Sequence, residues 1–241
     1  MSKRYSLVND PLYYVTVVLF ALLTTGLPAL IGQPIFMPIA QTLALFTFLI
    51  IPLRQGFIRQ TVLVMALWLF IQFIVILLAT LWAEQRVQVA FANGFLYRMA
   101  YVNWFYEAGG ALRPDGFSVR PLARSLELLG VTLGSLFTLG LVGIWFLVRA
   151  LNLAAFSMGA LMLSIGEPQA VIGALPLWSL VRIAGYAGLV ILLAEPLLTS
   201  NWNPVFYLRE RRRLLLTAVT LLLVGLMLEF FLPNFWRTLF R

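Results

Sequence analysis

Residues 61–82 read TVLVMALWLFIQFIVILLATLW, and this stretch decides the fold class. Gln72 is the only polar side chain in its middle. Because an α-helix rises about 1.5 Å per residue, the run is long enough to cross roughly 30 Å of hydrocarbon. The stretch therefore predicts a transmembrane helix.

The composition of the whole chain gives the same answer. Its 241 residues are 62% hydrophobic and 11% charged, and the mean hydropathy is +0.95. A soluble domain is nearer to half apolar and about a quarter charged, and a disordered chain has low hydrophobicity and high charge. The composition therefore predicts an all-α, polytopic bundle of transmembrane helices whose first partner is the lipid bilayer.

Several kinds of chemistry are excluded by missing residue types. The chain has no cysteine and no histidine, so disulfides, iron–sulfur clusters, imidazole-ligated haem, Ser-His-Asp triads and zinc-protease mechanisms are ruled out. No GxGxxG or GxxxxGK phosphate loop occurs, and neither a nucleophile motif nor a metal-ligand cluster is present. We therefore expect no enzymatic activity, no cofactor and no bound metal.

Further apolar runs extend the pattern in both directions. Lys3 and Arg4 precede a run of membrane length without a small-residue cleavage site, which predicts a first span rather than a cleaved signal peptide. Asp10-Pro11 opens this span as an N-cap followed by proline. The expected spans are 11–31, 35–53, 61–82, 128–148 (ended by Arg149) and 214–232.

Residues 151–198 are apolar but interrupted, and they allow two interpretations. Gly166-Glu167-Pro168-Gln169 breaks the helical pattern. Either two full spans flank this break, or a re-entrant hairpin with Glu167 at its tip precedes one short span. Two spans would give seven in total, and one would give six. We favour seven because the alternative places Arg209–Arg213 on the outer side, against the positive-inside rule.

The seven-span hypothesis predicts a multi-pass protein of the cell membrane with a cytoplasmic N-terminus, and it places Arg98 on the opposite side. The net charge of +8 indicates anionic headgroups and cytoplasmic loops rather than nucleic acid. The basic residues expected inside are Lys3, Arg4, Arg54, Arg59, Arg149 and Arg209 to Arg213.

An amphipathic segment interrupts the spans and divides the chain into three parts, 1–83, 84–124 and 125–241. Residues 86–107 are expected to form a helix, either lying at the membrane interface or packed over the bundle as a core helix. One face of this helix is a candidate docking surface. Its members are Phe91, Phe95, Met99, Val102 and Tyr106.

Ionisable residues inside apolar runs are costly and mark candidate functional sites. Arg182 and Glu195 are too far apart on one straight helix to pair. Arg182 therefore needs Glu229 or Glu167 from a neighbouring segment, unless it extends to an interface. The candidate buried polar site is Glu167, Arg182 and Glu229.

The second half of the chain, about 125–235, resembles the stage II sporulation protein M family of integral membrane proteins. Gly140, Gly143 and Asn152 are similar to the family's Gly-rich span and the Asn-containing turn after it. Residues 166–170 (GEPQA) are similar to its Glu-x-x-Ala segment, and residues 229–233 (EFFLP) to its closing motif. The family usually has His-Gly before that first glutamate, and this chain has no histidine. The resemblance implies a non-enzymatic membrane component with permease-like topology.

Three functional hypotheses follow. The leading one is a non-catalytic scaffold or membrane subunit of a larger complex, with other membrane proteins as partners. The alternative is a small permease or channel subunit for a solute, an ion or a lipid, with Glu167, Arg182 and Glu229 along the path. Convergence of these side chains on a hydrated cavity would favour transport. A third hypothesis is a subunit of an energy-converting or pigment complex, in which the missing histidine would require unusual ligands.

Overall fold

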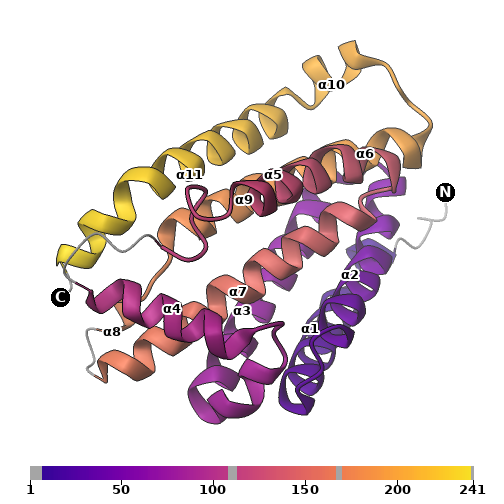
Figure 1. Cartoon of the computed structure of the whole chain (residues 1–241). Coiled ribbons are helices and arrows are strands. Elements are labelled where there is room, and N and C mark those ends of the chain that lie inside the picture. The colour runs from indigo at the N-terminus through magenta and orange to yellow at the C-terminus, as the bar shows by residue number, and fades with distance from the viewer. Residues whose placement is uncertain (1–6, 108–112, 167–169, 240–241) are drawn as a thin grey trace.

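The computed structural model describes residues 7–107, 113–166 and 170–239, and all regular secondary structure in these ranges is helical (Figure 1). This confirms the all-α prediction. The α-helices are α1 (Pro11–Ile31), α2 (Phe36–Arg54), α3 (Ile58–Val89), α4 (Gly94–Tyr106), α5 (Pro121–Leu129), α6 (Ser135–Phe137), α7 (Leu141–Ile165), α8 (Ala170–Gly173), α9 (Leu177–Thr199), α10 (Pro204–Glu210) and α11 (Arg212–Leu239). A 3-10 turn, Leu7–Asn9, precedes α1, and a π-helical turn, Gly130–Gly134, joins α5 to α6.

Six of these helices, α1, α2, α3, α7, α9 and α11, are long and apolar enough to cross a membrane. The expected N-terminal cap of α1 forms. The Asp10 side chain accepts a hydrogen bond from the backbone N–H of Leu12, and Gly32 ends the helix in the left-handed region with φ +78°. α3 is longer than the expected span, because a helical turn continues beyond non-helical Ala83.

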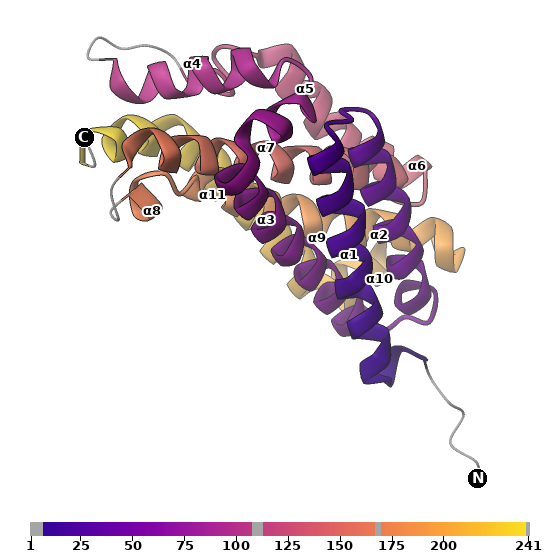
Figure 2. The same cartoon turned by 90° about the horizontal axis from the view of Figure 1, so that it is seen from below.

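The helix termini gather at two ends of the bundle (Figures 1 and 2). One end, called the α10 end, carries the start of α1, the α2–α3 turn, the α6–α7 turn and α10. The other, called the α4 end, carries the α1–α2 turn, α4 and α8. Since α4 lies at one end and α6 finishes at the other, the chain returns between them by way of α5 and α6. α5 and α6 therefore run toward the α10 end alongside the six long helices.

The expected span 128–148 is wrong. Leu139 and Gly140 adopt left-handed backbone angles, φ +57° and +92°, and reverse the chain in the middle of that apolar run. Gly130 and Gly134 let α5 and α6 pack closely along α7. A Cβ on Gly130 would lie 2.1 Å from the Phe146 side chain, and a Cβ on Gly134 would lie 2.6 Å from the Val142 side chain. The run is predicted as one span because no charged residue marks the turn.

Arg149 does not end a span either. It lies inside α7, which runs from Leu141 past Arg149 to Ile165, directly before the expected break at 166–169. Two long helices, α7 and α9, flank the break at 166–169, as the favoured interpretation of 151–198 expects. The first of them begins earlier than expected, at Leu141, and so takes in part of the expected span 128–148. Asn152, expected in a turn, is buried within α7.

α7 is the central helix of the bundle and contacts α2, α3, α4 and α9. Buried amide side chains connect it to its neighbours. Asn152 donates to Oε1 of Gln41 on α2 (2.7 Å) and accepts from Nε2 of Gln72 on α3 (2.7 Å). Trp68 in turn donates to Gln72 (3.1 Å). Hydrogen bonds of this kind join helices within a membrane, which explains why Gln72 is tolerated in the most apolar span.

Candidate functional site

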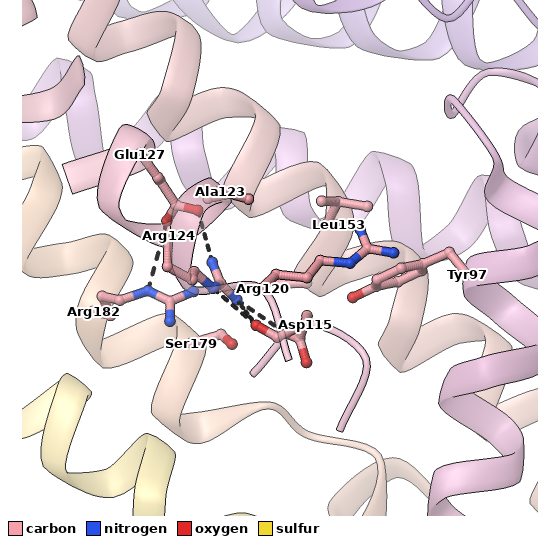
Figure 3. Close-up of a pocket in the computed structure, with 11 residues that line it drawn as sticks. Tyr97, Asp115, Arg120, Ala123, Arg124, Glu127, Leu153, Ser179 and Arg182 are labelled. Atoms are coloured by element: carbon pink, nitrogen blue, oxygen red, sulfur yellow. Dashed lines mark hydrogen bonds and ion pairs between the residues drawn. The ribbon is translucent and has the colours of Figure 1, made fainter. Parts of the chain in front are cut away.

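Six charged side chains lie together where the segment before α5, α5 itself, α9 and α11 meet. We call them the charge cluster, and its members are Arg113, Asp115, Arg124, Glu127, Arg182 and Glu229. Figure 3 shows Asp115, Arg124, Glu127 and Arg182 turned toward one another. With three guanidinium groups and three carboxylates, the cluster is electrically balanced.

Glu229 on α11 connects α9 to the segment before α5. Its Oε2 accepts from Nη1 of Arg182, and its Oε1 accepts from Nη2 of Arg113 at 2.6 Å. All three side chains are at most 5% exposed. Such charges persist in an apolar interior only when paired and hydrogen-bonded, and here each carboxylate oxygen has its own arginine.

Asp115 and Arg124 fix the segment before α5 against that helix. Arg124 donates from Nε and Nη2 to the backbone carbonyl oxygen of Asp115, at 2.8 and 2.6 Å. Its Nη2 also lies 3.3 Å from the Asp115 carboxylate, and Nε of Arg113 lies 2.5 Å from the same carboxylate. Burial alone would raise the pKa of Asp115. The attraction of Arg113 and Arg124 outweighs it and lowers the pKa below its ordinary value.

Glu127 completes the cluster on the α5 side. Its Oε2 accepts from Nη1 of Arg124 at 2.7 Å, three residues earlier on the helix. Its Oε1 lies 3.8 Å from Nε of Arg182, which is too long for a hydrogen bond. The two atoms face each other across a gap beside a cavity.

Close backbone contact between α9 and α11 places Arg182 beside Glu229. A Cβ on Gly225 would lie 2.6 Å from the backbone nitrogen of Arg182, and a Cβ on Gly185 would lie 2.6 Å from that of Leu222. Glu229 follows Gly225 by about one helical turn, so its side chain meets that of Arg182. Small residues thus allow the approach that the ion pair requires.

α5 turns its charges inward and its apolar side chains outward. Leu122, Leu126 and Leu129 are exposed, at 73%, 51% and 49%, whereas Arg124 and Glu127 face the cluster. This is the reverse of a helix on a soluble protein, and it is the arrangement expected where the surroundings are hydrocarbon.

A cavity adjoins the charge cluster, and a larger cleft lies next to that cavity. A central cavity of about 90 Å³ is bordered by Asp115, Arg124, Glu127, Ser179 and Arg182 (Figure 3), which is room for several water molecules. A larger cleft of about 670 Å³ lies between the α1–α2 turn, α4 and the side of α7, and we call it the α4 cleft. Tyr97, Arg120 and Leu153 line both hollows.

The structure brings together two of the three residues predicted for the buried site, Arg182 and Glu229. Glu167 lies outside the described residues. Glu195 pairs at the α10 end, where its Oε1 accepts from Nη2 of Arg211 at 2.7 Å.

The candidate docking face on α4 is divided by the packing of that helix. Phe91 precedes the helix and stacks on Phe156, with ring centroids 4.6 Å apart, and Val102 is half-buried. Phe95, Met99 and Tyr106 are exposed. The helix is held to the bundle by a different face, made of Tyr97, Tyr101, Trp104 and Phe105. The helix also begins later than expected, at Gly94, because Asn93 adopts a left-handed turn.

Four members of the charge cluster were not predicted, namely Arg113, Asp115, Arg124 and Glu127. Arg113-Pro114-Asp115-Gly116 has the composition of an exposed turn, so the sequence gives no indication that these charged side chains are buried. One signal was present: Arg124 and Glu127 lie three residues apart on one face of a short helix, opposite three leucines. Within residues 7–107, 113–166 and 170–239, no group of three acidic side chains is arranged to hold a metal ion.

Fold and site together define this chain as a multi-pass α-helical membrane protein with a buried, balanced charge cluster. No protein-family model matches the chain, and comparison with curated proteins and with solved structures gives no significant match.

Proposed function

We propose that the protein is a small permease-type membrane protein in which the charge cluster and the central cavity form the polar part of a path for a solute. One observation carries this proposal. Arg182 and Glu229 converge with four further charged side chains beside a cavity that shares lining residues with an open cleft. Ionisable groups within membrane helices characteristically mark ion and substrate pathways.

The polar atoms around the cavity support this proposal. Nε of Arg182 and Oε1 of Glu127 are buried, and they lie too far apart to form a hydrogen bond with each other. The gap of 3.8 Å between them is one that a water molecule or a polar solute group can bridge. A purely structural cluster would be expected to satisfy every buried donor and acceptor directly.

The proposal includes no catalytic step and no cofactor. The resemblance to the stage II sporulation protein M family is compatible with it, because that resemblance implies a permease-like topology. A scaffold or membrane subunit of a larger complex is the competing proposal, and no contact among the described residues specifically favours it. The two proposals differ in whether water reaches the cluster.

Cysteine accessibility tests this difference, since the chain has no native cysteine. Ser179→Cys places a thiol on the wall of the central cavity. The matched control, Ala187→Cys, lies farther along α9 in the apolar core. We expect a membrane-impermeant methanethiosulfonate reagent to label the thiol at position 179 and to leave position 187 unlabelled. Equal protection of both thiols would overturn the permease proposal.

A further inference from the structure

Two arginines in the α4 cleft stand apart from the charge cluster. Arg120 lies at the start of α5 and Arg149 lies within α7. Both side chains are exposed and both line the cleft. Figure 3 shows Arg120 directed toward Tyr97, away from Arg124. Among the described residues, no ion pair reaches either arginine.

The carboxylates near the cleft have other partners. The charge cluster uses Asp115, Glu127 and Glu229 to balance its own three arginines, and Glu84 pairs with Arg98. The cleft therefore carries two positive charges that the surrounding described side chains do not balance. Unbalanced charge in a partly apolar setting is costly, and it favours an anion bound from outside.

The remaining walls of the cleft are mostly apolar. Ile35, Pro38, Phe91, Leu96 and Leu153 line it, and Trp145 lies 5.8 Å from the Arg149 guanidinium in a cation–π contact. A volume of about 670 Å³ is within the range of small-molecule sites. It accommodates a headgroup and the first part of a chain rather than a whole lipid.

From these features we propose that the α4 cleft binds an anionic amphiphile with a phosphate headgroup. Arg120 and Arg149 would hold the phosphate, because planar guanidinium groups form paired, charge-assisted hydrogen bonds with phosphate oxygens. The apolar walls would hold the adjoining hydrocarbon. This cleft shares Tyr97, Arg120 and Leu153 with the central cavity, but the proposal concerns binding in the cleft, so it goes beyond the proposed function and does not require transport.

Native mass spectrometry of the full chain in detergent tests the proposal, with dioleoylphosphatidylglycerol, dioleoylphosphatidylcholine and inorganic phosphate as probes. We expect phosphatidylglycerol to bind at least about tenfold more tightly than phosphatidylcholine. Arg120→Gln with Arg149→Gln should remove that preference. The control, Arg54→Gln with Arg59→Gln, changes the charge equally at exposed positions outside the cleft and should retain it.

Three results would count against this assignment. Equal retention of phosphatidylglycerol by the cleft variant and the control variant would overturn it. Phosphate binding as tight as lipid binding would overturn the amphiphile part and leave a simple anion site. A second variant, Leu153→Trp, narrows the cleft without changing its charge. It should weaken the lipid without affecting inorganic phosphate, and unchanged lipid binding would contradict the assigned position.

Discussion

Arg182 on α9 donates to Glu229 on α11 at a point where the backbones of the two helices are in contact. Glu229 is one of the two carboxylates, with Glu167, that the cost of an arginine inside an apolar run predicts as a partner of Arg182. The structure adds that Glu229 is shared, since Arg113 approaches its other oxygen at 2.6 Å. Glu229 thereby connects α9, α11 and the segment before α5.

The first prediction concerns the energy of this pair. Arg182→Leu leaves Glu229 with less compensation and should lower the stability of the purified protein by about 3 kcal/mol or more. Adding Glu229→Gln should restore part of the loss, with a coupling energy of about 1 kcal/mol or more. Thermal unfolding in detergent measures both, with exposed Arg59→Leu as the control. Additive effects of the two substitutions would contradict a direct pair.

The second prediction concerns the helix contact that brings the pair together. Gly225→Ala introduces a Cβ 2.6 Å from the Arg182 backbone nitrogen and should cost about 1–3 kcal/mol through overpacking. Gly26→Ala is the matched control, because its Cβ would meet Val75 at an ordinary 3.6 Å. A melting temperature unchanged by Gly225→Ala would show that α9 and α11 are not so closely packed.

The third prediction concerns acid. Asp115 has a pKa below its ordinary value of about 4 because Arg113 and Arg124 attract its charged form. A lowered pKa contributes stability that is present above the ordinary pKa and is lost as the pH falls through the lowered one. Asp115→Asn should therefore destabilise the protein at pH 7, and the difference from wild type should shrink toward pH 3. A difference that is constant across this range would refute the role of the charge.

The fourth prediction concerns topology. The α10 end carries Arg54, Arg59 and Arg209–Arg213, so the positive-inside rule favours a cytoplasmic position for this end. Single cysteines introduced as Asn103→Cys on α4 and Arg213→Cys at the start of α11 should be labelled from opposite sides of the membrane. Both positions are exposed. Labelling of both from the same side would require a different number of crossings.

Some of this architecture was predictable because local rules specify it. The Asp10 cap, the Gly32 ending and the apolar run of 61–82 specify α1 and α3 without reference to the rest of the chain. Glu229 could be named as a candidate partner of Arg182 because burying an unpaired arginine is costly and few carboxylates lie within the apolar runs.

Other features depend on contacts that no local pattern encodes. The reversal at Leu139–Gly140 interrupts a continuous apolar run, and it becomes favourable only because α6 packs back along α7 and α9. Arg113 and Asp115 lie in a sequence typical of an exposed turn. Their burial depends on Glu229, which is more than a hundred residues away along the chain.

Two-sided accessibility of Ser179→Cys tests the proposal that the charge cluster lies on a path through the membrane. In sealed vesicles of each orientation, an impermeant thiol reagent would be applied first from the α4 side and then from the α10 side. In a permease the thiol at position 179 should react from both sides, while Ala187→Cys should react from neither. Reaction from one side only, or from neither, would contradict a permease and leave the cluster as a structural element of the bundle.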